Sequence, residues 1–191
     1  MLAASPLSAL NQHLTIGYDT ASWGGRMAQN PQMRQSEDDT RAERLARANI
    51  NPVTGLANDY LNHFNEAIML LEMLSDCPEC ADDLRAWKPK SYREHFAGSH
   101  FKERDLALEA YDAADPAVRR CLETLADAMT SVLETALAAM VAGMPQAATA
   151  RLAVSSAAAL RPLVAHAGAV INGEADAGQS TQAAIDVLMK R

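Results

Sequence analysis

The sequence predicts an all-α protein: an antiparallel helical bundle of four main helices, with a loosely structured N-terminal arm and a short C-terminal helix. Three observations support this prediction. No segment sustains the alternation of apolar and polar residues that is typical of a half-buried β-strand. Apolar residues recur instead every three or four positions, as they do on the buried face of a helix. Short loops join these stretches, which favours antiparallel neighbours.

The first part of the chain, residues 1–50, predicts an N-terminal arm and a polar surface helix, followed by a helical bundle domain at 51–191. Residues 1–35 are weakly patterned and contain several glycines and prolines that interrupt regular structure. A short helix fits at 7–14. Ser36 then has the features of a helix N-cap, because acidic residues follow it directly and arginines come later. We expect this helix on the surface, since it carries few apolar residues.

Three of the main helices begin at recognisable caps. Asn51-Pro52 places a capping residue before a proline at the first helical position, which predicts a helix over 51–75. The segment from Ser91 to Glu94 is a capping box and predicts a helix over 91–113. Asp115-Pro116 repeats the cap-then-proline signal and predicts a helix over 115–141.

The remaining elements are a loop, an alanine-rich helix and the C-terminal helix. Residues 77–90 predict a loop that carries Trp87. The fourth main helix is predicted over 146–172 and is closed by Gly173, a residue that favours helix C-termini. A polar stretch and a short helix over 181–190 end the chain.

Charge and composition exclude several classes of partner and suggest a location. The net charge is −7, which argues against a nucleic-acid partner, because such proteins need a basic surface. The N-terminus lacks the charged and apolar regions of a signal peptide. The most apolar run, 136–144, is far shorter than the roughly 18 residues of a membrane span. Three cysteines exclude a complete disulfide framework and fit a reducing compartment, so we expect a cytoplasmic protein without a membrane partner.

One cysteine and histidine spacing predicts a zinc site. Cys77 and Cys80 are separated by two residues, and fourteen residues later come His95 and His100. Thiolate and imidazole ligands at this spacing match the loose pattern of tetrahedral zinc sites. His95 and His100 lie about 140° apart around an ideal helix, so both reach one ion only if Gly98 breaks the helix. As a redox pair the two cysteines lack the βαβ context of thioredoxin-like motifs.

A second metal hypothesis uses residues on two neighbouring helices. His63 and Glu66 stand three residues apart on the helix over 51–75, and Glu94 and His95 stand on the next helix. Inward-facing histidine and glutamate side chains hold iron or zinc in carboxylate-bridged helical bundles. Here the order of the motif is reversed and it occurs once. A hydrogen-bonded His63–Glu66 pair beside the core explains the pattern as well.

Recognition is predicted for residues 57–111. No aromatic residue follows Tyr111, so the second half of the chain has the composition of a scaffold. The stretch between Arg47 and Arg85 contains seven acidic residues and no lysine or arginine, and a basic stretch follows it. The helix over 115–141 adds Leu133, Leu137 and Val141 to its main apolar stripe, which places it either at the centre of the bundle or against a second copy of the chain in a homodimer.

Together these observations favour a non-enzymatic helical accessory or regulatory protein that acts by protein–protein interaction, with an unidentified protein partner. The sequence lacks a phosphate-binding glycine loop, a nucleophile elbow and an HExxH motif. The alternative is a metal-binding helical-bundle protein. Its cofactor would be structural zinc held by the cysteines and histidines, or iron or zinc held by the His/Glu set.

Overall fold

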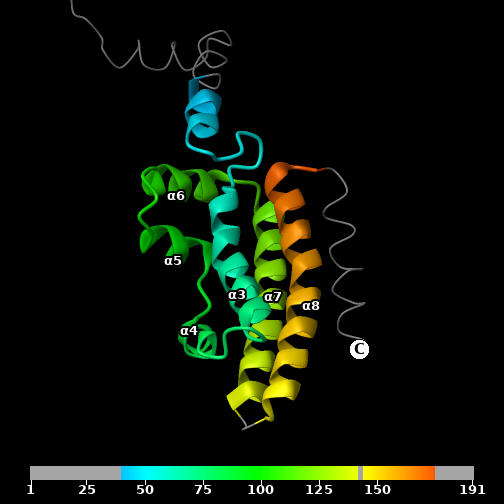
Figure 1. The fold of residues 1–191 in the computed structure, drawn as a ribbon. Coiled ribbons are helices and arrows are strands. Elements are labelled where there is room, and N and C mark those ends of the chain that lie inside the picture. The colour runs from blue at the N-terminus through cyan, green and yellow to red at the C-terminus, as the bar shows by residue number, and fades with distance from the viewer. Residues whose placement is uncertain (1–39, 142–143, 175–191) are drawn as a thin grey trace, which may run out of the picture. The chain divides into compact units, whose positions relative to one another are not determined.

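The protein is mostly helical over the residues that its computed structural model describes, which are 40–141 and 144–174 (Figure 1). Within these ranges the only β-type pairing is an isolated antiparallel bridge between Ile50 and Ala57. The prediction of an all-α protein is therefore confirmed. The N-terminal arm at 1–35, with its helix at 7–14, and the C-terminal helix at 181–190 lie outside the described residues.

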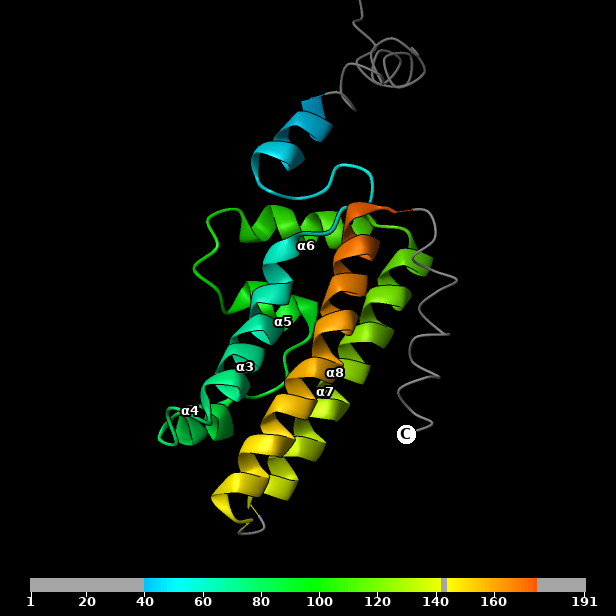
Figure 2. The same ribbon diagram turned by 45° about the vertical axis from the view of Figure 1, so that its right-hand side comes forward.

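A helical segment at 40–47 is followed by one 3-10 helix and six α-helices. Their bounds are η1 Asn58–Leu61, α3 Asn62–Met73, α4 Cys80–Ala86, α5 Tyr92–Ala97, α6 Arg104–Ala113, α7 Pro116–Val141 and α8 Gln146–Asn172. The three long helices α3, α7 and α8 lie side by side in both views (Figures 1 and 2). The chain descends α7 and returns along α8, so these two helices are antiparallel, and α3 packs against α8.

The second of the four predicted main helices, over 91–113, had Gly98 as a possible break, and the chain there does form two helices. α5 begins at the predicted capping box, in which the backbone N–H of Glu94 donates to the Ser91 hydroxyl. It ends after one and a half turns at Gly98, and α6 begins only at Arg104. In the turn between them the Ser99 hydroxyl accepts a hydrogen bond from the Phe101 N–H. This turn lets Phe101 pack edge-on against Phe96, with ring centroids 5.3 Å apart.

Two other predicted boundaries also differ from the structure. Asn51 does cap a turn, since its side-chain oxygen accepts hydrogen bonds from the N–H groups of Val53 and Thr54. The turn is not continued into a helix, because Gly55 adopts a left-handed conformation with φ +72°. Helical structure starts seven residues later than predicted, at Asn58. The predicted loop over 77–90 contains the short helix α4.

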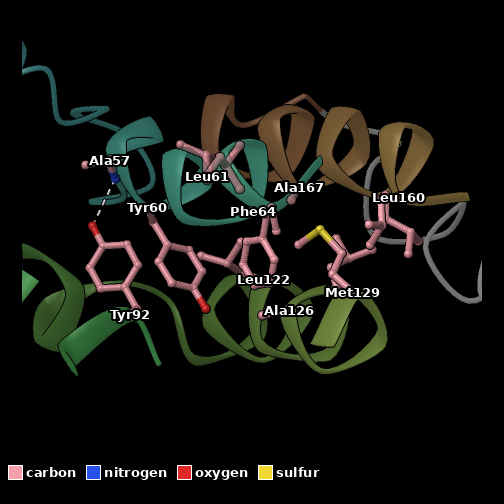
Figure 3. Close-up of a cluster of buried hydrophobic side chains, with 14 of the residues drawn as sticks. Ala57, Tyr60, Leu61, Phe64, Tyr92, Leu122, Ala126, Met129, Leu160 and Ala167 are labelled. Atoms are coloured by element: carbon pink, nitrogen blue, oxygen red, sulfur yellow. Dashed lines mark hydrogen bonds between the residues drawn. The ribbon is translucent and has the colours of Figure 1, made fainter. Parts of the chain in front are cut away.

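The core lies between α3, α7 and α8 and is filled by large apolar side chains. Figure 3 shows Phe64 pointing from α3 toward Leu122 of α7, with Met129 and Leu160 in the next layer. All four are fully buried. The apolar stripes read from the sequence supply this core, and their main members in the structure are Tyr60, Phe64, Ile68, Leu71, Leu122, Leu125, Met129 and Leu133.

Hydrogen bonds join the segment that precedes α3 to the end of α8. The Thr54 hydroxyl donates a 2.6 Å hydrogen bond to the carbonyl of Ile171, 117 residues later. The Asn58 amide donates to the side-chain oxygen of Asn172 at 3.1 Å. Residues 41–191 group as one unit, and Leu45, which belongs to the predicted surface helix, is 1% exposed within its core. The division of the chain at residue 50 stays a prediction.

α8 is long and apolar enough to cross a membrane, by length and composition alone. Its most apolar window has a mean hydropathy of 1.3, and 39% of that window is buried within the protein. The sequence predicted no segment long and apolar enough to cross a membrane, and α8 differs from that prediction. Because α8 packs against both α3 and α7, a core helix explains the same composition. The absence of a membrane partner stays a prediction.

Replacing Gly55 with alanine should lower the free energy of unfolding by about 2 kcal/mol, since a left-handed conformation costs an L-residue about 1–2 kcal/mol. The added methyl group would also stand 2.7 Å from the carbonyl oxygen of Ala110. Gly168→Ala in α8 is the matched control. Its nearest neighbour would be the Leu61 Cδ1 at 3.8 Å, an ordinary contact, so we expect no loss or a gain of up to about 1 kcal/mol. Urea denaturation of both variants measures the difference, and equal stabilities would contradict the prediction.

Candidate functional site

Three tyrosines from three different elements meet beside α7. Tyr92 of α5 stacks on Tyr111 of α6, with ring centroids 4.4 Å apart and ring planes 13° apart. Tyr60 of η1 lies 5.3 Å from Tyr92. The Tyr92 oxygen accepts a hydrogen bond from the Ala57 N–H at 3.0 Å (Figure 3). The Tyr60 hydroxyl donates to the carbonyl of Lys90, also at 3.0 Å. These bonds fix the rings before any partner arrives.

The tyrosines form the floor of a pocket of about 700 Å³, called here the tyrosine pocket. One side is the segment 89–94 that leads into α5, and the other is a polar face of α7. Its lining residues are Tyr60, Pro89, Lys90, Ser91, Tyr92, Arg93, Glu94, Tyr111, Arg119, Leu122, Glu123, Ala126, Asp127 and Thr130. The α7 residues of this pocket lie outside the predicted recognition stretch, 57–111, and recognition by that stretch stays a prediction. The sequence does show the α7 side, because Arg119, Glu123 and Asp127 recur every four residues and so share one face of the helix.

Two arginines pack on Tyr111 at the edge of the tyrosine pocket. The guanidinium carbons of Arg93 and Arg119 lie 5.4 Å and 5.5 Å from the centroid of the Tyr111 ring, within cation–π range. Arg93 also pairs with Asp112. The Arg119 Nε atom is buried and has no hydrogen-bond partner among the described residues. Because a buried donor without a partner is costly, an acceptor supplied from outside would be stabilised here.

The tyrosines of the pocket are neutral. Burial raises the pKa of Tyr111 to about 12, and the hydrogen bond from its hydroxyl to Glu123 acts in the same direction. Burial also raises the pKa values of Tyr60 and Tyr92 above the ordinary value. At the pocket rim, hydrogen bonds from Ser91 lower the pKa of Glu94. The pocket therefore presents neutral phenol rings together with ionised arginine and carboxylate groups.

Two histidines pack behind the tyrosines. His63 stacks on Trp87, with ring centroids 4.7 Å apart and planes 18° apart. His95 lies 5.7 Å from Tyr60 and 6.2 Å from His63. Burial lowers the pKa of His63 to about 4, with Lys90 and His95 adding to the effect, while a hydrogen bond to the Lys88 backbone opposes it. Burial also lowers the pKa of His95. Both rings are therefore neutral near pH 7.

The structure does not bring the predicted zinc set together. Cys77 and Cys80 are joined as a disulfide, so neither sulfur is a thiolate ligand. His95 packs among aromatic rings, and His100 is exposed beyond the end of α5. Gly98 does end the helix, as the zinc hypothesis required. Within 40–141 and 144–174, no group of three or more His, Cys, Asp or Glu side chains is placed to hold a metal ion. Zinc binding stays a prediction.

The second predicted set is brought together only in part. His63 and His95 are neighbours, with their ring centroids 6.2 Å apart. Glu66 is exposed on α3, and the Glu94 carboxylate accepts hydrogen bonds from the N–H and hydroxyl of Ser91. The expected boundary contact of His63 with Glu66 is replaced by stacking on Trp87. The sequence periodicity predicted that His63 lies at the edge of the core. In the structure His63 is buried and only 6% exposed.

An apolar groove runs between α4 and the second half of α7. It comprises two adjoining hollows of about 540 Å³ and 380 Å³, which share Arg85 and Leu137. Trp87 and Leu84 lie on its α4 side, and Met140 and Met144 continue its α7 side. The groove adjoins the tyrosine pocket, because Pro89 lines both.

No protein-family model matches the chain, and no curated protein or solved structure is significantly similar to it.

Proposed function

We propose that this protein is a cytoplasmic, non-enzymatic helical accessory or regulatory protein that acts by binding a protein partner at the tyrosine pocket. The observation that carries the proposal is the composition of this pocket: two arginines stack on Tyr111 at its edge, above a base of three tyrosines that are only 2–5% exposed. Tyrosine and arginine are enriched among the residues that dominate binding energy at protein interfaces.

Pre-ordering of the pocket supports tight binding. The hydroxyl groups of Tyr60 and Tyr92 are held by backbone hydrogen bonds, and that of Tyr111 is held by Glu123. Immobilising a flexible side chain at an interface costs about 0.5–1.5 kcal/mol, and this cost falls when the side chain is already fixed. The long helices α7 and α8 then serve as the scaffold that holds the pocket.

Charges at the rim favour a protein partner of mixed charge. Lys90 and Arg93 lie on the α5 side, while Glu123 and Asp127 lie on α7. A nucleic acid would meet these carboxylates as well as the overall charge of −7. A partner carboxylate would pair with the half-buried guanidinium of Arg119, and a partner lysine or arginine would pair with Asp127.

Arg119→Gln should weaken binding of the partner about tenfold or more, because arginine is enriched among the hot-spot residues whose truncation costs about 2 kcal/mol or more. The test captures proteins from lysate of the source cells on immobilised full-length protein and compares their amounts by mass spectrometry. Arg151→Gln is the matched control, since Arg151 is exposed on α8 and does not line the pocket. A partner lost equally from both variants, or retained by both, contradicts the proposal, and thermal melts show that both variants are folded.

Homodimer formation loses part of its support. Leu133, which was expected either at the bundle centre or against a second copy, is fully buried within its own chain. Leu137 is partly buried against the same core and lines the apolar groove. Central burial therefore explains the broad stripe of α7 over these residues, and the homodimer stays a prediction that sedimentation analysis tests.

The metal-binding alternative also stays open to measurement. Elemental analysis of protein purified without chelator tests both ligand sets at once. A near-stoichiometric metal that is lost in His95→Ala would support a metal site, because His95 belongs to both sets. Stripping the metal should then lower the thermal stability.

A further inference from the structure

We propose that Cys77 and Cys80 form a reversible thiol–disulfide exchange site that reacts with neutral or cationic thiols in preference to anionic ones and that controls the order of α4. The two cysteines are joined across a tight turn, with their Cα atoms 5.6 Å apart, within the normal range for a disulfide. This inference goes beyond partner binding and uses residues outside the tyrosine pocket.

Backbone hydrogen bonds support the turn that brings the cysteines together. The Cys77 N–H donates to the carbonyl of Met73 at 2.8 Å, which continues the end of α3. The Cys80 N–H donates to the carbonyl of Cys77 at 3.0 Å. Because these bonds do not involve the sulfur atoms, the turn re-forms after reduction and returns the two thiols to each other for re-oxidation. A disulfide that closes so short a loop also restrains the unfolded chain only weakly.

Exposure decides which sulfur reacts. Cys77 is half-buried, whereas Cys80 is 7% exposed and belongs to the core. The thiolate of an external thiol therefore attacks the Cys77 Sγ, and the S–S bond breaks with its electron pair on Cys80. A second thiolate, from the same dithiol or from another thiol molecule, then displaces Cys77 from the mixed disulfide. The reductant becomes a disulfide, two electrons pass to the protein, and the two thiol protons of the reductant end on Cys77 and Cys80.

Carboxylates around the site select the thiol. Asp76, Glu79, Asp82 and Asp83 flank the two cysteines, and all four are exposed. The nearest arginine in the sequence, Arg85, is already paired with Asp82. An anionic thiol is repelled by this surface, and the repulsion is screened as ionic strength rises. The same carboxylates disfavour thiolates on Cys77 and Cys80, which favours the disulfide over the dithiol.

The disulfide stabilises the start of α4. This helix has only seven residues, too few to be stable without contacts from the rest of the protein. Its first residue, Cys80, is tied by the disulfide to the chain leaving α3, and Leu84 anchors its middle in the core. Reduction removes the first of these two anchors. The α4 side of the apolar groove, which includes Ala81 and Arg85, should then become less ordered.

The thiol selectivity is tested on air-oxidised full-length protein. Cysteamine, a cationic thiol, and 3-mercaptopropionate, an anionic one, are supplied at equal thiolate concentration, and free cysteines are alkylated and counted by mass spectrometry. Each rate is divided by the rate of the same thiol with a small uncharged disulfide, because the two thiolates differ in intrinsic nucleophilicity. We expect cysteamine to reduce the bond at least about threefold faster at low salt, with a smaller ratio at high salt. Asp76→Asn combined with Glu79→Gln should shrink the ratio, whereas Glu109→Gln on α6 should not. Equal rates at low salt, or three alkylated cysteines before any reductant is added, would overturn the proposal.

The coupling to α4 is tested by amide hydrogen exchange. After reduction, we expect the amides of Cys80–Ala86 to exchange about tenfold faster, while those in the middle of α8 keep their protection. Cys77→Ser should show the fast exchange under both conditions. Cys121→Ser keeps the disulfide pair and should behave like the wild type. Unchanged exchange in α4 after complete reduction would refute the coupling.

Discussion

Replacing Phe64 with alanine is expected to lower the free energy of unfolding by about 3–5 kcal/mol. Phe64 is 0% exposed and is the aromatic centre of the core between α3 and α7 (Figure 3). Its ring also contacts Tyr60 edge-on, with centroids 5.6 Å apart, and lies 6.2 Å from Trp87. The loss combines the transfer of the ring to water with the cavity that it leaves behind. Urea denaturation followed by circular dichroism measures the change.

Met69→Ala is the control for this substitution. Met69 lies on the same helix, five residues further on, and is 52% exposed. We expect its loss to stay within about 0.5 kcal/mol, because surface substitutions away from special features have small effects. A similar loss for both variants would show that α3 is not packed as described here.

Acidification should destabilise the protein between pH 6.5 and pH 4 through His63. Its pKa is about 4 in the folded protein against an ordinary value of 6.5. In this window His63 binds a proton in the unfolded chain but not in the folded protein, so the free energy of unfolding falls as the pH falls. This loss is complete below the folded pKa of His63. The difference of about 2.5 pKa units corresponds to at most about 3 kcal/mol. The midpoint of urea unfolding, measured from pH 7 to pH 4, follows this loss.

His63→Gln isolates the contribution of this group. Glutamine does not titrate, so the variant should lose less stability than the wild type over the same pH range, even if it is less stable at pH 7. His100→Gln is the matched control, because His100 is exposed beyond α5. The same pH dependence in wild type and His63→Gln would assign the acid sensitivity to other groups.

Local signals in the sequence predicted the parts of the fold that depend on neighbouring residues. The capping box at Ser91 starts α5, and the Asp115 side chain accepts a hydrogen bond from the Ala117 N–H at the start of α7. Gly173 ends α8 in a left-handed conformation with φ +75°. Each of these features depends on residues within one or two helical turns, so it can be predicted from the sequence alone.

Features that depend on distant residues were not predicted. α4 lies in a stretch without a strong start signal and owes its stability to packing of Leu84 in the core. The tyrosine pocket needs α7 beside α5, a juxtaposition that no local pattern encodes. The pairing of Cys77 with Cys80 was ranked below zinc binding because the two cysteines lack the βαβ context of thioredoxin-like motifs.

The hydrogen bond between Thr54 and Ile171 bears on the order in which the protein folds. α7 and α8 are consecutive, so their contacts form by closing a short connection. Docking of α3 on α8 joins segments about a hundred residues apart and carries a larger loop-closure entropy. The antiparallel pair should therefore form early and offer a surface on which the earlier half of the chain assembles. The hydrogen bonds of Thr54 and Asn58 to the end of α8 would then form last. During synthesis, the core would assemble only after α8 has left the ribosome.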